Sequence, residues 1–389
     1  MAAERPLDGL RVLDLSRLLP GPYATMVLGD LGARVDKIED PSAGDYLRLM
    51  PPHKGGMNAL FHTLNRGKRS LILDLKRVEG QTALLRLLPR YDVLVESFRP
   101  GVMARLNLGV ERLRTVHPGL VYCAITGYGQ DGPLAHRAGH DLNYLARAGV
   151  LGFTGPSDGP PQVPGVQMAD IGGGALFAVV GILAALASRA RSGIGGFVDI
   201  SMCEGALALA AVGFGTTEAG HDARGGSDVL SGGIAPYNTY RAKDGKYVAL
   251  GALEPKFWTS FCEGVGLTPS MEAMMPGPHQ IEWKNRVAEK IATRTRDEWA
   301  AFGAERDCCI EPVLEPGEVF LDTQHRHRGV FAETTLPDGA SIRQLSTPAA
   351  RGAVAGAGPG HGAHTDEVLG EGGFTPSEID ALRAAGATR

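Results

Sequence analysis

Short apolar segments alternate with longer amphipathic segments along the first third of this chain. Short segments at 11–16, 34–39, 70–75, 92–96 and 120–125 have the length and pattern of strands, and apolar residues dominate 70–75 and 120–125. The intervening segments, among them 23–31, 79–88 and 102–116, have the periodicity of helices. Strands separated by helices of about 10 to 15 residues are typical of βαβ units. We therefore expect an α/β fold with an open parallel sheet.

The remainder of the chain indicates a second, smaller α+β domain. Apolar helices are expected over about 172–190 and 202–214, and the Gly-, Asp- and Ser-rich stretch that follows is typical of a linker. Beyond it, Asp244-Gly245 between two apolar runs predicts a hairpin. The predicted domains are a large α/β domain at 1–214, a linker at 215–233, a small domain at 234–315, and a return segment at 316–389 that rejoins the large domain.

Composition excludes several classes of partner. The formal net charge of −4 lacks the basic excess of nucleic-acid-binding proteins. Five scattered cysteines without zinc-type spacing are typical of a reduced, cytoplasmic chain. The N-terminus lacks the apolar region of a signal peptide, and the longest apolar stretch, Ala175–Ala187, is short for a membrane span. We expect a cytoplasmic protein that binds neither nucleic acid nor membrane.

Familiar nucleotide-binding and hydrolase motifs are absent from the sequence. The turn at Pro20-Gly21-Pro22 lacks the GxGxxG pattern of dinucleotide-binding proteins. The glycine-rich segment 356–362 has no preceding strand and no following Walker lysine, and no serine lies in a GxSxG elbow. The site must therefore be sought elsewhere.

Two residues in glycine-containing segments are candidates for proton transfer. His140 belongs to Gly139-His140-Asp141-Leu142-Asn143-Tyr144, and histidine is the residue type whose ordinary pKa, about 6.5, suits proton exchange near neutral pH. Asp170 precedes Gly172-Gly173-Gly174 and an apolar helix. Glycines are unfavourable in a helix, and close approach of a ligand to the backbone is the expected reason for them.

Asp170 has a second interpretation, as the N-cap of that apolar helix. The two roles compete, because capping lowers a carboxyl pKa, whereas a general base near neutral pH needs a raised one. Burial beneath a substrate would have to outweigh the cap.

Longer motifs resemble the class III CoA-transferase superfamily over nearly the whole chain. The matching segments are 15–22, 65–76, 92–102, 126–133, 253–257 and 364–369. Within that superfamily, the segment Gly139–Tyr144 resembles the Gly-His-Asp-(Ile/Leu)-Asn-Tyr motif of the α-methylacyl-CoA racemases. The run before Asp170, starting at Pro164, and the segment 43–48 are closer to the transferases.

The resemblance implies an enzyme of lipid metabolism that interconverts (2R)- and (2S)-2-methylacyl-CoA thioesters through an enolate. His140 and Asp170 would exchange the α-proton on opposite faces, and Glu254 would orient the histidine. No metal or redox cofactor is implied, since CoA is part of the substrate. Members of the family are interlocked homodimers, with the active site between the large domain of one chain and the small domain of the other.

The resemblance also implies a CoA-binding role for the large domain. The positions that match substrate or CoA contacts are Leu73, Lys76, Arg99, Arg105, Gly139, Asp141, Asn143 and Tyr144. Asp40 departs from this pattern, because many members have an arginine that contacts CoA there. The set of phosphate-binding residues is therefore expected to be rearranged.

Two alternatives stay open. A class III CoA-transferase would move CoA between carboxylic acids through a mixed anhydride at Asp170. A non-catalytic acyl-CoA-binding protein would keep only the fold. His140 favours the racemase, since the transferases commonly have other residues at its position.

Overall fold

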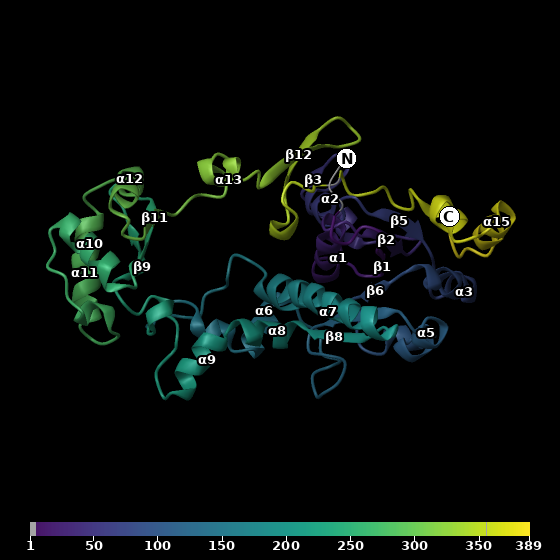
Figure 1. Ribbon diagram of the computed structural model, residues 1–389, viewed down its shortest axis with the longest axis horizontal. Coiled ribbons are helices and arrows are strands. Elements are labelled where there is room, and N and C mark those ends of the chain that lie inside the picture. Colours follow the sequence, from purple (N-terminus) through teal and green to yellow (C-terminus); the bar gives the residue numbers. More distant parts are fainter. Residues whose placement is uncertain (1–4, 355) are drawn as a thin grey trace. The chain divides into compact units, whose positions relative to one another are not determined.

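Six parallel strands form the main sheet (Figure 1). The structure, a computed structural model, describes residues 5–354 and 356–389. The strand order is β5-β2-β1-β6-β7-β8, and every neighbouring pair is parallel. The strands are β1 (Arg11–Asp14), β2 (Arg34–Glu39), β5 (Arg69–Ile72), β6 (Val93–Glu96), β7 (Val121–Thr126) and β8 (Phe197–Ser201). The expected open parallel α/β sheet is confirmed.

The helices between these strands begin and end close to the expected positions, with one exception. Helices α1 (Pro20–Asp30) and α3 (Val78–Leu87) match single predicted helices. The helix expected over 102–116 is instead two, α4 (Val102–Arg105) and α5 (Val110–Val116). Asn107 between them has a φ of 57°, a left-handed conformation that ends a helix. The prediction of one continuous helix is therefore wrong.

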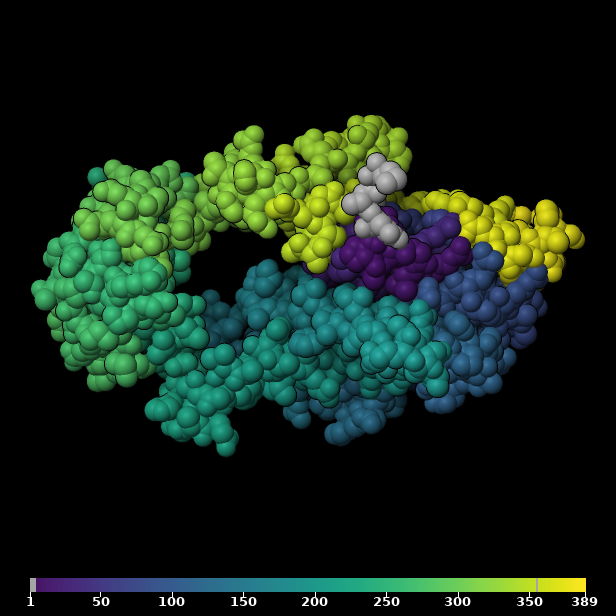
Figure 2. Space-filling view, viewed as in Figure 1, coloured from purple at the N-terminus to yellow at the C-terminus, as the bar shows by residue number. Residues whose placement is uncertain are grey.

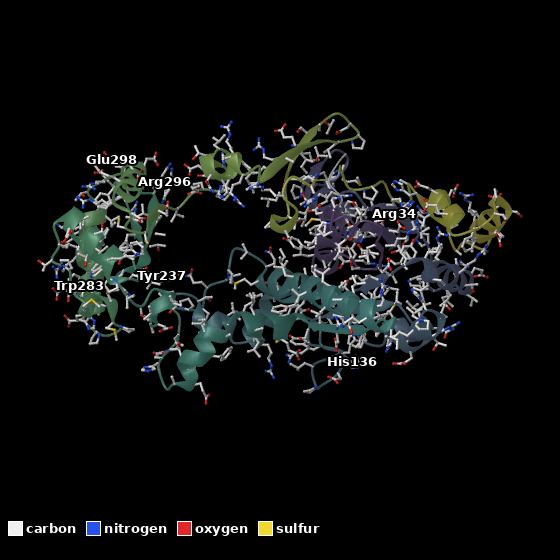
Figure 3. The ribbon with its side chains drawn as sticks, viewed as in Figure 1. Arg34, His136, Tyr237, Trp283, Arg296 and Glu298 are labelled. Atoms are coloured by element: carbon white, nitrogen blue, oxygen red, sulfur yellow. The ribbon has the colours of Figure 1, made fainter. Side chains whose placement is uncertain are left out.

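The chain divides into two compact units, and the first contains the sheet. It comprises 1–144, 167–208 and 323–389, less the undescribed residues. The C-terminal helices α14 (Thr365–Glu371) and α15 (Pro376–Ala384) belong to it, and Leu369 and Leu382 join its buried core. Arg34 of β2, labelled in Figure 3, forms an ion pair with Glu371 of α14 at 2.6 Å. In Figure 2 the yellow C-terminal segment lies against the purple N-terminal part.

The second unit comprises 145–166 and 209–322. Its antiparallel sheet has the order β11-β10-β9, and the predicted hairpin is β9 and β10. Its core gathers the rings of Trp258, Phe261 and Trp299. The elements are α9 (Ala211–Glu218), β9 (Tyr237–Arg241), β10 (Tyr247–Gly251), α10 (Pro255–Val265), α11 (Gln280–Ile291), α12 (Arg296–Arg306) and β11 (Ile310–Pro312). This division into compact units does not test whether the predicted domains fold independently, so their boundaries stay predictions.

Several short elements of the first unit have no counterpart in the sequence analysis. They include two hairpins, β3 with β4 and β12 with β13. The bounds are β3 (His53–Lys54), β4 (Met57–Asn58), α2 (Ala59–Leu64), α6 (Asp141–Arg147), α13 (Thr323–His327), β12 (Phe331–Thr335) and β13 (Ser341–Leu345). The apolar helix expected over 202–214 is instead two, α8 (Met202–Leu209) and α9. The first turn of α6 belongs to this unit and contains residues of the site described below.

One helix is longer than expected. A π-helical segment, η4 (Met168–Leu176), continues directly into α7 (Phe177–Ser192). The combined helix is long and apolar enough to cross a membrane by length and composition, which corrects the expectation that no segment is. A core helix passes the same test, and this one packs against α1, β7 and β8.

Candidate active site

His140 lies in a turn at the start of α6 that Asn143 holds in place. The His140 amide donates to Asn143 Oδ1 at 3.0 Å, and the His140 carbonyl accepts from the Asn143 amide at 2.8 Å. This is one half of a capping box, in which a first-turn side chain satisfies the amide of the residue before the helix. The backbone is thereby fixed, while the His140 side chain is exposed.

Tyr144 packs beneath this turn and explains two of the neighbouring glycines. Its hydroxyl donates to the Gly139 carbonyl at 2.5 Å, and its ring meets that of Tyr128 edge to face. A Cβ atom would lie 2.7 Å from the Tyr144 ring at Gly139 and 2.5 Å from it at Gly127. Neither position has room for a side chain while the tyrosine is in place.

Asp170 is the third residue of η4, and the glycines after it pack against α8. A Cβ atom on Gly205 would lie 2.0 Å from the Gly173 carbonyl oxygen. A Cβ atom on Gly174 would lie 2.8 Å from Met202 Cγ. Two helices that cross at backbone contact require glycine at the crossing. Helix packing, rather than the expected approach of a ligand, therefore explains Gly173 and Gly174.

Asp141 performs the capping role that was considered for Asp170. Its Oδ1 accepts from the amides of Ala169 and Asp170 at 2.8 and 2.9 Å. These amides lie in the first turn of η4, where no partner exists within the helix. The N-cap position itself is Gln167, so the capping interpretation of Asp170 is wrong. The Asp170 carboxylate is left free for another role.

The pKa of Asp170 is raised to about 6, mainly by burial and further by the neighbouring charge of Asp141, whereas His140 lowers it. A partly buried carboxyl loses hydration, and this loss disfavours its ionised form. The shift is in the direction that a proton-transfer group near neutral pH needs. Burial thus outweighs the helix terminus, because Asp141 already occupies the amides there.

A pocket of about 700 Å³ brings His140 and Asp170 together. Gly139, Asn143 and Tyr144 also line it, and its cationic residues are Arg17, Arg99 and Arg137. All of its lining residues belong to the first unit. Glu254 does not line it: this residue directly precedes α10 in the second unit, and its side chain is exposed.

A second pocket, of about 260 Å³, contains two of the expected CoA contacts, Leu73 and Lys76. Its other walls are in part apolar, with Leu15, Ile38 and Phe98 among them. They are also in part acidic, with the carboxylates of Glu39, Asp40 and Asp74. Arg105, at the end of α4, lines neither this pocket nor the larger one. The apolar walls of the pocket suit a flat ring, and Lys76 and Arg17 are its cationic groups.

Buried charges hold the loop at residues 16–18, which lies between the two pockets. Lys37 and Asp45 have no exposed surface and lie 3.2 Å apart. Lys37 Nζ donates to the Ser16 carbonyl at 2.6 Å, and both carboxylate oxygens of Asp45 accept from the Leu18 amide at 3.3 Å. These bonds stabilise the left-handed conformation of Leu18, whose φ is 62°.

From the sequence, this loop was noted only as part of the matching segment 15–22, and Arg17 was given no role. A lysine within a predicted strand was the available signal, because lysine is rarely buried without a partner. Lys37 is that residue in β2.

Comparison with known proteins decides the family. The model of CoA-transferase family III matches residues 7–365. The chain belongs to this family.

Relatives within family III include both expected chemistries. The α-methylacyl-CoA racemase of Homo sapiens is 38% identical, with 97% of this chain and 96% of that protein covered. The succinyl-CoA:glutarate CoA-transferase of Mus musculus is 33% identical, with 88% and 79% covered. A solved CAIB/BAIF family protein from Brucella suis superimposes with a TM-score of 0.80 at 30% identity, covering 95% of this chain and 99% of that one. The resemblance inferred from the motifs is confirmed.

Proposed function

We propose that this chain is an α-methylacyl-CoA racemase that interconverts the (2R) and (2S) epimers of a 2-methylacyl-CoA thioester. The observation that carries the proposal is the shared pocket of His140 and Asp170, in which the pKa of Asp170 is about 6. The similarity to the human racemase over 97% of the chain supports it. Inversion of a single carbon requires two proton-transfer groups that reach it from the same pocket.

The residues have complementary roles in this mechanism. His140 removes the α-proton from one epimer, and protonated Asp170 returns a proton to the opposite face. The roles are reversed for the other epimer. Amide groups at the start of α6, near Asp141, stabilise the enolate oxygen that forms between the two transfers. A carboxyl with a pKa near 6 can act in either direction at neutral pH.

The proposed assembly is a cytoplasmic, interlocked homodimer. Several large apolar side chains on the first unit are exposed in the single chain, as expected of a face that a second copy covers. They are Leu176, Val180, Phe197 and Leu207. In this assembly Glu254 of the partner subunit orients His140. Measurement of the mass in solution tests the dimer, and loss of exchange in a Glu254→Gln variant tests the role of Glu254.

Proton NMR in deuterated water tests the proposed reaction. The wild-type protein is expected to exchange the α-proton of (2R)- and (2S)-2-methylacyl-CoA without an acceptor acid. Absence of exchange at concentrations of CoA thioester that saturate the enzyme would contradict the proposal.

A CoA-transferase is the second candidate. The observation in its favour is the 33% identity to a succinyl-CoA:glutarate CoA-transferase together with an accessible Asp170 in the pocket. This function predicts turnover only with an acceptor acid and an acyl anhydride at Asp170 that hydroxylamine traps. Binding of acyl-CoA with neither reaction would indicate the non-catalytic alternative.

A further inference from the structure

Arg17 and Phe98 lie at the boundary between the two pockets. Among the residues that the structure describes, these two line both the larger pocket, which contains His140 and Asp170, and the smaller one. The guanidinium carbon of Arg17 lies 5.8 Å from the centre of the Phe98 ring, within range of a cation–π contact. Any ligand that occupies both pockets must pass this pair.

The backbone of Arg17 is fixed on both sides. Its amide donates to Ser97 Oγ at 3.2 Å, the preceding carbonyl accepts from Lys37, and the following amide donates to Asp45. Both of these charged groups are fully buried. Because the backbone is held in this way, the side chain is the part of Arg17 that can change its partner.

Asp40 is the present partner of that side chain. Its Oδ2 lies 3.2 Å from a guanidinium nitrogen of Arg17, with side chains that are 26% and 38% exposed. Its Oδ1 accepts from the amides of Ser42 and Ala43 at 2.9 and 3.2 Å, so a turn holds the carboxylate in position. An ion pair with this exposure contributes little stability and can exchange with a stronger anion.

We infer that Arg17 binds the diphosphate of the CoA thioester and that Asp40 competes with the diphosphate for its guanidinium. The inference rests on the proposed function, since it requires a CoA thioester. CoA carries its diphosphate between an adenosine and the pantetheine arm. With the nucleotide in the smaller pocket and the thioester beside His140, the diphosphate lies at the boundary. The planar fork of arginine matches two phosphate oxygens.

Calorimetric titration with CoA itself tests the inference without any need for turnover. Arg17→Met is expected to raise the Kd for CoA about tenfold, the loss of one strong charge-assisted contact. The Kd of the same variant for dephospho-CoA, which keeps the diphosphate, is expected to rise by the same factor. Asp40→Asn is expected to lower the Kd about threefold by removal of a competing surface ion pair. In the Arg17→Met background, Asp40→Asn should bring no such gain.

A truncated substrate separates the diphosphate from the rest of the ligand. For the 2-methylacyl thioester of pantetheine, kcat/KM of proton exchange should be the same within about twofold in wild type and Arg17→Met, because no phosphate is present. A loss of kcat/KM for this substrate in Arg17→Met as large as the loss of affinity for CoA would overturn the inference. So would a tighter or unchanged Kd for CoA in Arg17→Met, or a loss for CoA that dephospho-CoA does not share.

The chain contains a matched control pair. Arg86 and Glu378 are 2.7 Å apart with 40% and 46% exposed side chains, and Arg86 lies over the Phe374 ring at 4.0 Å. Neither lines the two pockets. Arg86→Met and Glu378→Gln are expected to leave the Kd for CoA unchanged. A loss in Arg86→Met as large as that in Arg17→Met would overturn the inference in favour of a general charge effect. Wild-type protein that binds CoA but exchanges no proton would contradict the proposed function alone.

Discussion

The side-chain carboxylate of Asp141 accepts a hydrogen bond from the backbone amide of Asp170 at 2.9 Å. Asp141 directly follows His140 in the chain, so this bond joins the two segments that hold the candidate proton-transfer groups. The same carboxylate raises the pKa of Asp170 through the repulsion of like charges. Asp141 therefore influences both the position and the acidity of Asp170.

Asp141→Asn separates these two effects, because asparagine keeps an oxygen for the two amides but has no charge. Removal of the neighbouring negative charge lowers the pKa of Asp170 from its value of about 6. The limb of the pH–rate profile that reports Asp170 is expected to move to lower pH in proton-exchange assays. Asp141→Ala, which also removes the cap, should cost about 1 kcal/mol of stability in addition. A movement to higher pH in Asp141→Asn would contradict this account.

His140→Ala is expected to slow exchange of the α-proton with deuterated water at least about a hundredfold, the usual contribution of a general acid–base group. Asp170→Asn should have a similar effect, since each group serves one face of the same carbon. Both variants are measured by NMR with either epimer as substrate, and unchanged circular dichroism serves as the control for folding. Full exchange in His140→Ala would exclude the histidine from the mechanism.

Gly205→Ala is expected to lower the free energy of unfolding by about 1–3 kcal/mol, the usual range for an overpacked site. The added methyl group would lie 2.0 Å from the Gly173 carbonyl oxygen, so α8 and η4 must separate. Gly215 in α9 has no atom near its Cβ position and provides the control. Gly215→Ala should be neutral or stabilising by up to about 1 kcal/mol, because alanine favours the helix. Denaturant titration compares the two.

Glu96→Gln is expected to reduce the dependence of stability on pH. Burial raises the pKa of Glu96 from 4.5 to about 7, and the side chain accepts from the Phe98 amide and the Tyr122 hydroxyl. The folded protein thus binds this proton more tightly than the unfolded chain does, so stability is lost as pH rises from about 4.5 to 7.

Glutamine stays neutral and avoids that loss, which is on the order of 3 kcal/mol above pH 7. Melting temperatures of Glu96→Gln and wild type at pH 5 and pH 8 test this, with the exposed Glu111→Gln as control. An equal decrease of the melting temperature from pH 5 to pH 8 in Glu96→Gln and wild type would contradict the assignment of this pH dependence to Glu96.

The sequence by itself determined the parallel sheet, the family and the residues with suitable chemistry. Apolar runs such as 70–75 and 120–125 predict strands because a strand buried on both faces needs mostly apolar residues. The Gly139–Tyr144 motif marked His140 through residue types alone. At Asn107 a local signal was passed over, because asparagine is one of the few residues that adopt the left-handed conformation, and here it divides the expected helix.

Only the tertiary structure decided what these residues do to one another. Gly173 and Gly174 face α8, and two amides of η4 are capped by Asp141 from a distant segment. The pKa of Asp170 and the position of Arg17 between two pockets also depend on residues far away in the chain. Propensities and caps act over a few residues, whereas burial and electrostatic fields depend on which segments the fold brings together.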